Sequence, residues 1–503
     1  MASRPRAEAV LPELVLPQPW QPVPYMKRAV RWLLEHACAG LFLDPGMRKT
    51  SITLAAFSVL KKQGLAKKML VIAPRRVCYE VWPAEVRKWT DFHHLRVVVL
   101  HGPAKEARLR EAADVYVINP EGLDWLLGAA RTRRGNRIAV TTDVTGFRRL
   151  GFDVLCVDEL TRFKSSTSGR FKILKTVIHL FRYRWGLTGS PAANGLEQLF
   201  GQISLLDQGN AFGPYVSHFR QRFFSPIGDF KWVPQAGAEE LIYRQLAKLV
   251  LRLDADEYLQ LPEVVDVDVA IELPDDVRAT YDALEQDLLA RVGDRTITAK
   301  NVGVAVGKCR QVTGGGLYLE PDALAVLQGR LAPRRGKREV LELHTLKTAA
   351  ALELVEELQG QPVLILYEFA HELARANAVF GEAVPFIAGG VSDRRVAELK
   401  AAWNRNELPY LFAQTASVAL GLNLQEGHAA HLCHLTPTWD YEYYDQVIRR
   451  LRRSGNTATR IFNHRLVAKG TVDVQVLGAL RRKETGQRAL FAALQRLAKE
   501  RGY

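Results

Sequence analysis

The sequence predicts an α/β fold in which two lobes, each a parallel sheet flanked by helices, are joined by a mostly helical segment. The chain has 503 residues, more than one ordinary hydrophobic core accommodates, so two domains are expected. Short apolar runs alternate with longer segments of helical periodicity in the N-terminal and again in the C-terminal part. Continuous apolar strands that alternate with helices are typical of parallel sheets buried on both faces.

The first lobe is expected at residues 25–210. It follows a proline-rich extended arm, residues 1–24, and opens with a helix at about residues 26–36. Each strand candidate is an apolar run followed by a segment with helical spacing. These runs are GLFLD at 40–44, KMLVIAP at 68–74, LRVVVLHG at 95–102, DVYVIN at 114–119 and FDVLCVDE at 152–159.

The pattern changes between residues 211 and 345, where the segments are mostly helical and charged. A glycine-rich break lies at residues 314–316, and a basic run, APRRGKR, lies at residues 332–338. Neither feature has the alternation of a buried strand. We expect this region to be a helical insertion and linker.

The alternation of strands and helices returns in a second lobe at residues 346–480. A C-terminal helix is expected at residues 481–503, where apolar residues recur at helical spacing among basic ones. The strand candidates of this lobe are PVLILYEF at 362–369, AVPFIAGG at 383–390, PYLFAQTA at 409–416, AAHLCHLT at 429–436 and TRIFNHRLV at 459–467.

The composition indicates a basic protein that works in a reducing compartment. The formal net charge is +15, and a surplus of Lys and Arg attracts polyanions, so nucleic acid is the leading class of partner. The five cysteines contain no C-x-x-C pair, which is typical of core thiols in a cytosol. Neither a signal peptide nor a membrane span is expected. We predict a cytoplasmic protein.

A phosphate-binding loop is predicted where the first strand ends, in the segment LDPGMRKT. Gly46 allows a tight turn, Lys49 can reach terminal phosphates, and the Thr50 hydroxyl can bind Mg²⁺. The position before the lysine is usually glycine, but here it is Arg48. If this position is left-handed, a non-glycine residue costs about 1–2 kcal/mol. An ordinary strand-to-helix turn is the alternative interpretation.

Two acidic residues, Asp158 and Glu159, follow the apolar strand FDVLCV. A magnesium nucleotide needs a carboxylate at the end of a strand beside the phosphate loop, and a second carboxylate can polarise the attacking water. Acidic residues also close strands for structural reasons. Their place about a hundred residues after a phosphate loop favours the roles in nucleotide binding.

Small polar residues follow another short strand, YRWGLT. Thr188, Gly189 and Ser190 stand between this strand and a helix, where hydroxyl groups can contact the carboxylates and the phosphate. A simple turn is the alternative interpretation.

In the second lobe, Gly421 and Asn423 end an apolar segment, and a helix is expected to carry Gln446, Arg450 and Arg453. The two arginines are three residues apart, so they share a helix face and can reach one phosphate group. Arginine suits this task because its charge is permanent and its donors are forked. A solvated basic face is the alternative for the run IRRLRR.

Taken in order, these segments resemble the Snf-type ATPases of helicase superfamily two, a branch with chromatin remodellers and many phage-encoded helicase-like proteins. The resemblance covers roughly residues 24–480. It rests on PYMKRAVRWLL before the first strand, LDPGMRKT, VIAPRRVCYEVWPAEVRKW, VINPEGL, VDELTRFK, LTGSP, LRLDADEYLQLPE, GKCRQVTGG, PVLILYEF, GLNLQ and QVIRRLRRSGN.

The resemblance implies two RecA-like lobes with ATP and Mg²⁺ in the cleft between them and DNA, duplex or forked, as a sequence-tolerant partner. It implies that Thr50 and Asp158 hold Mg²⁺. The residues implied to contact ATP or to catalyse its hydrolysis are Tyr25, Gly46, Met47, Arg48, Lys49, Thr50, Ser51, Asp158, Glu159, Gly421, Asn423, Gln446, Arg450 and Arg453. Those implied to couple hydrolysis to nucleic acid are Lys164, Thr188, Gly189 and Ser190.

Two departures from the family pattern affect nucleotide binding. Met26 stands near the place of a glutamine that usually reads the adenine edge, and Arg48 replaces a glycine. The leading hypothesis is a DNA-stimulated ATPase that moves along DNA or remodels it. The alternatives are a nucleic-acid-binding scaffold without turnover and a motor subunit of a restriction or repair complex. The histidines show no metal-ligand spacing typical of a nuclease.

Overall fold

The computed structural model describes residues 17–134, 137–227, 231–293, 299–319, 339–419 and 422–500. The chain forms two compact units, and neither is continuous in sequence. Unit 1 consists of residues 1–39, 48–158 and 169–186, and unit 2 consists of residues 40–47, 159–168 and 187–503.

The first sheet has seven strands in the order β11-β1-β8-β7-β2-β4-β3. Their bounds are β11 (Val250–Leu253), β1 (Cys38–Leu43), β8 (Tyr183–Thr188), β7 (Val154–Asp158), β2 (Met69–Ile72), β4 (Val115–Ile118) and β3 (Val97–Val99). Every residue of β2, β4, β7 and β8 is buried, as expected for strands covered on both faces. The apolar runs of the first lobe are thus confirmed as strands.

The helices of the N-terminal half follow these strands along the chain. They are α1 (Pro24–Glu35), α2 (Lys49–Lys62), α3 (Arg75–Glu80), α4 (Trp82–Lys88), α5 (Lys105–Arg110), α6 (Leu123–Leu126), α7 (Val144–Arg149), α8 (Gly169–Val177) and α9 (Leu199–Asp207). A hairpin of β5 (Ala130–Arg134) and β6 (Arg137–Thr141) lies between α6 and α7.

The middle of the chain contains helices and also strands. Its elements are α10 (Val216–Phe223), β9 (Phe224–Ile227), β10 (Lys231–Pro234), α11 (Ala238–Leu246), β12 (Glu263–Ile271), α12 (Asp275–Gly293), α13 (Ala299–Thr313), β13 (Gly316–Tyr318) and β14 (Val340–Glu342). Two of its strands join the large sheets, since β11 pairs with β1 and β12 pairs with β19. The basic run at residues 332–338 lies outside the described residues.

The second sheet has six strands in the order β12-β19-β18-β15-β17-β16, and each strand is parallel to its neighbours. Besides β12, the strands are β15 (Val363–Tyr367), β16 (Phe386–Ile387), β17 (Tyr410–Gln414), β18 (His431–His434) and β19 (Arg460–Ala468). They confirm the five apolar runs of the second lobe. The helices are α15 (Leu346–Glu357), α16 (Ala370–Phe380), α17 (Asp393–Asn404), α18 (Thr415–Ala419), α19 (Tyr441–Leu451) and α20 (Val472–Glu500).

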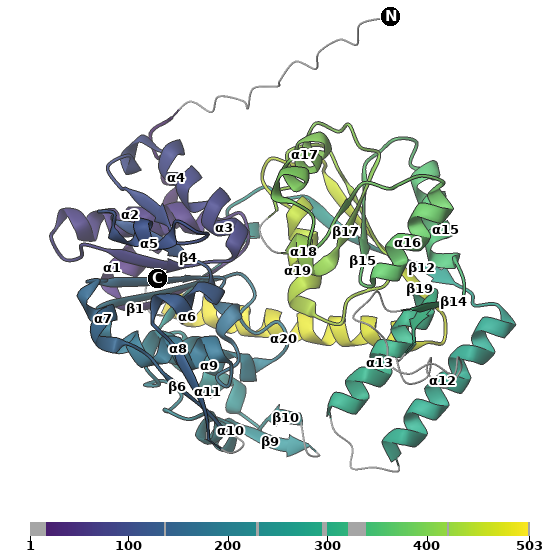
Figure 1. The fold of residues 1–503 in the computed structure, drawn as a ribbon, viewed down its shortest axis with the longest axis horizontal. Coiled ribbons are helices and arrows are strands. Elements are labelled where there is room, and N and C mark those ends of the chain that lie inside the picture. The colour runs from purple at the N-terminus through teal and green to yellow at the C-terminus, as the bar shows by residue number, and fades with distance from the viewer. Residues whose placement is uncertain are drawn as a thin grey trace, which may run out of the picture. The chain divides into compact units, whose positions relative to one another are not determined.

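The second sheet is buried on both faces because its side chains alternate. Leu364 and Leu366 pack into one hydrophobic cluster with residues of α17, α18 and α19. Val363 and Ile365, the alternate residues of the same strand, pack into another cluster with α15 and α16 (Figure 1). This period of two explains why the strand is a continuous apolar run in the sequence.

The C-terminal helix begins earlier than residue 481, where the sequence placed it. Helix α20 begins at Val472 because the Thr471 hydroxyl accepts a hydrogen bond from the amide of Asp473 at 3.3 Å, as an N-cap does. Across the described residues, no helix combines the length and the apolar character that a membrane crossing requires. All five cysteines are free thiols, and every one except Cys38 is buried.

At the other terminus, residues 1–16 of the expected arm lie outside the described residues. The part of the arm that is described packs on unit 1, where the ring centroids of Trp20 and Phe92 lie 5.5 Å apart. Helix α1 then begins at Pro24, close to the predicted start.

Candidate active site

The predicted phosphate loop connects β1 to α2. Gly46 has a φ of 90°, and helix α2 begins at Lys49 without a side-chain cap. The first amides of a helix can bind an anion when no side chain satisfies them. Thr50 and Ser51 follow in the first turn, and Met47 is fully buried beneath the loop. The local structure therefore has the geometry that phosphate binding requires.

Arg48 adopts the left-handed backbone conformation for which the sequence analysis gave an energy cost. Its φ is 50° and its ψ is 39° at the start of α2, so the strain of about 1–2 kcal/mol is present in the fold. The guanidinium group lies 5.5 Å from the ring centroid of Trp89, a cation–π contact worth about 0.5–1 kcal/mol when exposed. The loop thus closes with an arginine in place of glycine.

Tyr25 and Met26 of α1 are both buried in unit 1. Burial raises the pKa of Tyr25, while the positive charge of Arg48 partly opposes this shift. This electrostatic interaction places Tyr25 near the loop residue Arg48. Met26 contributes a thioether to the core, and it has no group that could form the hydrogen bonds of a glutamine.

The acidic pair begins at the end of β7. The indole nitrogen of Trp82 donates a hydrogen bond to Asp158 Oδ2 at 3.1 Å, which fixes the orientation of this buried carboxylate. Glu85, three residues after Trp82, accepts a hydrogen bond from Trp89 Nε1 at 2.6 Å. The tryptophan and glutamate of this segment therefore support Asp158 and the ring beneath Arg48.

Glu159 is a second residue with left-handed backbone, at a φ of 56°. Non-glycine residues hold this conformation only where the surroundings determine it, and such residues cluster at functional sites. The turn after Glu159 is held by α19, since Thr161 Oγ1 and Lys164 Nζ donate to the Glu442 carboxylate at 2.6 and 3.0 Å.

Thr188, Gly189 and Ser190 follow β8, the neighbour of both β1 and β7. The Ser190 amide donates to Thr188 Oγ1 at 3.2 Å, which stabilises the turn. A β-carbon on Gly189 would lie 2.9 Å from Pro45 Cδ, so only glycine fits beside the phosphate loop. The Ser190 hydroxyl donates to Asp445 of α19 at 3.0 Å.

The basic run IRRLRR ends helix α19 earlier than predicted. The helix stops at Leu451, so the prediction that Arg453 lies on it is wrong. The Asn456 side chain donates to the Leu451 carbonyl at 3.0 Å, and Gly455 takes a φ of 104°. These two residues terminate the helix, because the first satisfies its last carbonyl and the second turns the chain.

The four arginines of this run fall into two pairs. Arg449 forms ion pairs with Asp44 and Asp445, at 2.8 Å each. Arg452 forms an ion pair with Asp256 at 2.6 Å. Among the described residues, neither Arg450 nor Arg453 forms an ion pair with a carboxylate. The structure thus separates two arginines that form ion pairs with carboxylates from two that do not.

Arg450 is buried and Arg453 is half-buried, and desolvation lowers the pKa of both guanidinium groups. The charge of Glu159 partly opposes this shift for both, which places them near the second acidic residue. A buried cation without a carboxylate partner is destabilised until an anion binds. The pair is therefore a candidate site for an anion.

Backbone and amide oxygens orient the two arginines. Arg450 Nη2 donates to the Ala419 carbonyl at 2.5 Å, and Arg453 Nη1 donates to Asn423 Oδ1 at 2.7 Å. Arg453 also lies beside the phosphate loop, since a β-carbon on Gly46 would lie 3.5 Å from its Nε. Gln446 is buried on α19, and Gly421 lies outside the described residues.

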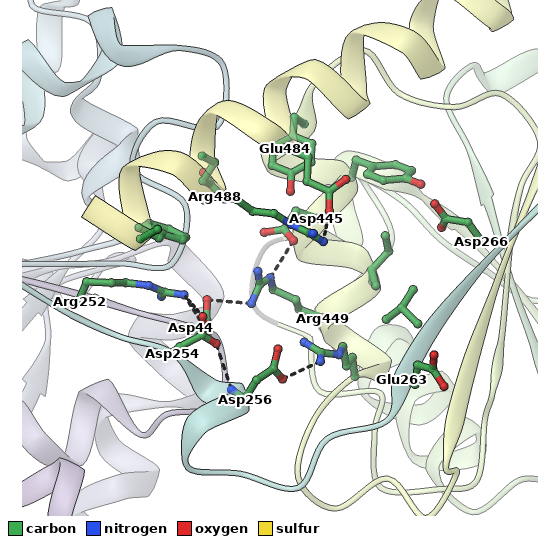
Figure 2. A pocket seen from close by; sticks show the side chains of 18 of the residues that line it. Asp44, Arg252, Asp254, Asp256, Glu263, Asp266, Asp445, Arg449, Glu484 and Arg488 are labelled. Carbon is green, nitrogen blue, oxygen red and sulfur yellow. Dashed lines mark hydrogen bonds and ion pairs between the residues drawn. The ribbon is translucent and has the colours of Figure 1, made fainter. Parts of the chain in front are cut away.

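Asp44, the first residue after β1, is the centre of an ion-pair network in unit 2 (Figure 2). Its two oxygens bind Arg449 and Arg252, each at 2.8 Å. Although burial raises the pKa of Asp44, the two guanidinium groups outweigh this effect and lower it to about 2. The network lies in the wall of a cavity of about 580 Å³ that α19 and α20 also line.

A family model described as the SNF2-related domain matches residues 25–308, which is more than half of the chain. The chain belongs to the SNF2 family. The SNF2 family has a helicase-like ATPase core and uses ATP, typically with Mg²⁺. The two parallel sheets with their flanking helices are the two RecA-like lobes of this core.

The match with this chain covers different shares of the lengths of its SNF2 relatives. Protein p41 of Acyrthosiphon pisum secondary endosymbiont phage 1 is 31% identical over 494 residues, which are 94% of this chain and 99% of p41. YwqA of Bacillus subtilis (strain 168), by name a candidate ATP-dependent helicase/translocase, is 24% identical over 92% of this chain and 48% of its own length. This chain thus spans nearly all of p41 but about half of YwqA.

A solved SNF2 structure also matches the chain. The Sulfolobus solfataricus SWI2/SNF2 ATPase core in complex with dsDNA is 22% identical and has a TM-score of 0.40. The match covers 93% of this chain and 92% of the archaeal one.

The oxygen donors fit the Mg²⁺ that SNF2 proteins typically use. Mg²⁺ prefers one or two carboxylates together with substrate phosphates rather than a cage made only of protein groups. Asp158 offers one carboxylate and Thr50 one hydroxyl. The described residues contain no cluster of three or more His, Cys, Asp or Glu side chains that could hold a metal ion.

Sequence reasoning missed the residues whose ion pairs connect the segments of the candidate site. Asp44 stands inside the segment LDPGMRKT, and Arg449 stands inside IRRLRR, but neither was singled out. A buried acid directly after an apolar strand is only a weak indication of a functional residue. No local signal identifies Arg449, because its partner Asp44 is distant in the sequence. Glu442, which binds Lys164, was missed for the same reason.

Proposed function

We propose that this chain is an ATP-dependent DNA translocase or helicase, whose ATP hydrolysis drives movement along duplex or forked DNA or remodels it. The observation that carries the proposal is the pair Arg450 and Arg453, which form no ion pair with a carboxylate among the described residues. Arg450 is buried, Arg453 lies beside Gly46, and the charge of Glu159 acts on both. This arrangement supports binding and turnover of a nucleotide whose terminal phosphate needs charge compensation.

Each remaining residue has a proposed role in this reaction. Lys49 and the first turn of α2 bind the phosphates, while Thr50 and Asp158 hold Mg²⁺, which compensates the phosphate charge when bound. Glu159 orients the attacking water. Arg450 and Arg453 stabilise the negative charge that develops on the transferred phosphoryl group, and Asn423 orients Arg453 through its amide.

DNA is the proposed track on two grounds. The net charge of +15 favours a polyanion, and relatives include a DNA annealing helicase and endonuclease, ZRANB3 of Homo sapiens, at 24% identity over 82% of this chain. Lys164, at the turn after Glu159, and the segment Thr188–Ser190 are proposed to connect nucleic-acid binding to the nucleotide. Contacts to phosphates would make the binding tolerant of sequence and sensitive to salt.

A scaffold that binds nucleic acid without turnover is the second candidate, and the strained Arg48 favours it. A panel of ATPase assays separates the two candidates. Turnover is measured with duplex, single-stranded and forked DNA and with RNA, each at two salt concentrations. Stimulation by DNA that weakens as salt rises supports the motor. DNA binding without turnover supports the scaffold, and equal stimulation by RNA contradicts DNA as the track.

A further inference from the structure

We infer that Asp44 and Arg449 are positioning residues for ATP hydrolysis: their buried ion pair holds Arg450 and Arg453 in place against the phosphate loop. The inference rests on the proposed ATPase function. It assigns a role to two residues that the proposed function leaves without one. Neither side chain is proposed to touch the nucleotide. Both are proposed to act through the neighbouring arginines.

A continuous chain of two hydrogen bonds and one ion pair runs through unit 2. Ser190 Oγ donates to Asp445 Oδ2 at 3.0 Å, and Asp445 Oδ1 accepts from Arg449 Nε at 2.8 Å. Arg449 Nη1 then binds Asp44 Oδ1 at 2.8 Å (Figure 2). The chain thus connects the turn after β8, the helix of the arginines and the first residue of the phosphate loop.

The Asp44 carboxylate is itself held by contacts other than that with Arg449. Its Oδ2 accepts from Arg252 Nη2 at 2.8 Å and from the Ala255 amide at 3.0 Å. The guanidinium carbon of Arg252 lies 3.7 Å from the ring centroid of Phe491 in α20. Arg449 therefore binds a carboxylate whose position is determined by β11 and α20, and not by Arg449 itself.

Arg449 lies close in the sequence to both proposed catalytic arginines. It directly precedes Arg450 and lies four residues before Arg453, whose guanidinium group is next to Gly46. Asp44 is two residues before Gly46. One buried ion pair thus ties the arginine segment to the glycine turn that Arg453 must face. A displacement of about 1 Å at a reacting group can cost about a hundredfold in rate.

The chain contains a matched control for this ion pair. Arg452 and Asp256 also connect the same arginine segment to the end of β11, at 2.6 Å. The Asp256 side chain is 56% exposed, whereas that of Asp44 is 2% exposed. Exposed pairs hold their geometry weakly because water competes for both charges. Loss of the Arg452 pair is therefore not expected to move Arg450 or Arg453.

The test is a double-mutant cycle with Asp44→Asn, Arg449→Gln and the combined variant, measured as kcat of the DNA-stimulated ATPase and as affinity for a fluorescent ATP analogue. We expect each single variant to lower kcat by about a hundredfold and to change nucleotide affinity by less than about threefold. The combined variant should lose no more than either single variant, because both changes remove the same interaction. Arg449→Lys should restore part of kcat.

The matched cycle with Asp256→Asn and Arg452→Gln should leave kcat within about twofold of the wild type. The combined variant Asp44→Asn/Arg449→Gln leaves neither member of the pair charged, so it tests the inference even if a single variant fails to fold. Additive losses, or parallel loss of kcat and nucleotide affinity, would overturn the positioning role. If the wild type does not hydrolyse ATP, the proposed function fails and the inference fails with it.

Discussion

The guanidinium group of Arg453 lies next to the α-carbon of Gly46, where an added β-carbon would be 3.5 Å from Nε. An arginine from the C-terminal part of the chain and a glycine of the phosphate loop thus meet within one compact unit. Arg453 has no carboxylate partner among the described residues, so its charge remains available at this place. Substitution of the two arginines is therefore the most direct test of the site.

We predict that Arg450→Ala and Arg453→Ala each lower kcat of the DNA-stimulated ATPase by about a thousandfold or more, as loss of an arginine that stabilises transferred phosphoryl charge does. The reason is that Arg450 is buried and Arg453 lies beside Gly46 of the proposed phosphate loop. The measurement is steady-state ATPase activity alongside nucleotide affinity. Arg452→Ala serves as the control, because Arg452 is paired with Asp256. Equal losses for all three variants would contradict a special role for the pair.

Arg48→Gly should change both stability and turnover only modestly. Glycine relieves about 1–2 kcal/mol of left-handed strain, but it loses a cation–π contact of about 0.5–1 kcal/mol and increases the entropy of the unfolded chain by a similar amount. These effects nearly cancel. Urea unfolding and ATPase assays measure both quantities. Strong activation by glycine would instead show that Arg48 disables the site.

Arg48→Val is the companion variant at this position. A β-branched residue is a poor fit to a φ of 50°, so this variant should be less stable than both the wild type and the glycine variant. Equal stability of the valine variant would contradict a left-handed loop.

The stabilising effect of Asp44 should depend on pH in the acid range. Its pKa is lowered from 3.8 to about 2 in the folded protein, so its charged form stabilises the fold above about pH 4. This contribution, about 2 kcal/mol, is lost as pH falls from 4 to 2. The difference in unfolding free energy between the wild type and Asp44→Asn should therefore narrow over this range. A constant difference would contradict the network.

A buried histidine should reduce stability below neutral pH. Burial lowers the pKa of His434 from 6.5 to about 3, and the charge of Arg465 acts in the same direction. Between about pH 6.5 and 3, the unfolded chain binds a proton here that the folded chain does not, so stability falls as pH falls. His434→Phe should reduce the slope of unfolding free energy against pH by about one proton in this window.

The sequence alone determined most of the architecture of this protein. The ten apolar runs became strands because a strand covered on both faces is mostly apolar, and this pattern is visible locally. The loop from Gly46 to Thr50 and the acids Asp158 and Glu159 were predictable for a similar reason, since phosphate and Mg²⁺ chemistry needs these residue types at the ends of strands. The edge strands β11 and β12 were not predicted, because they lie between charged helices.

Only the tertiary structure decided which arginines of IRRLRR are available to an anion and which are not. Spacing placed Arg450 and Arg453 on one helix, but the helix ends at Leu451 and Arg453 reaches Gly46 from the turn that follows. Arg449 is set apart by its ion pair with Asp44, a residue at the other end of the sequence. Such pairs depend on where the whole chain brings two charges together, and local periodicity carries no information about that.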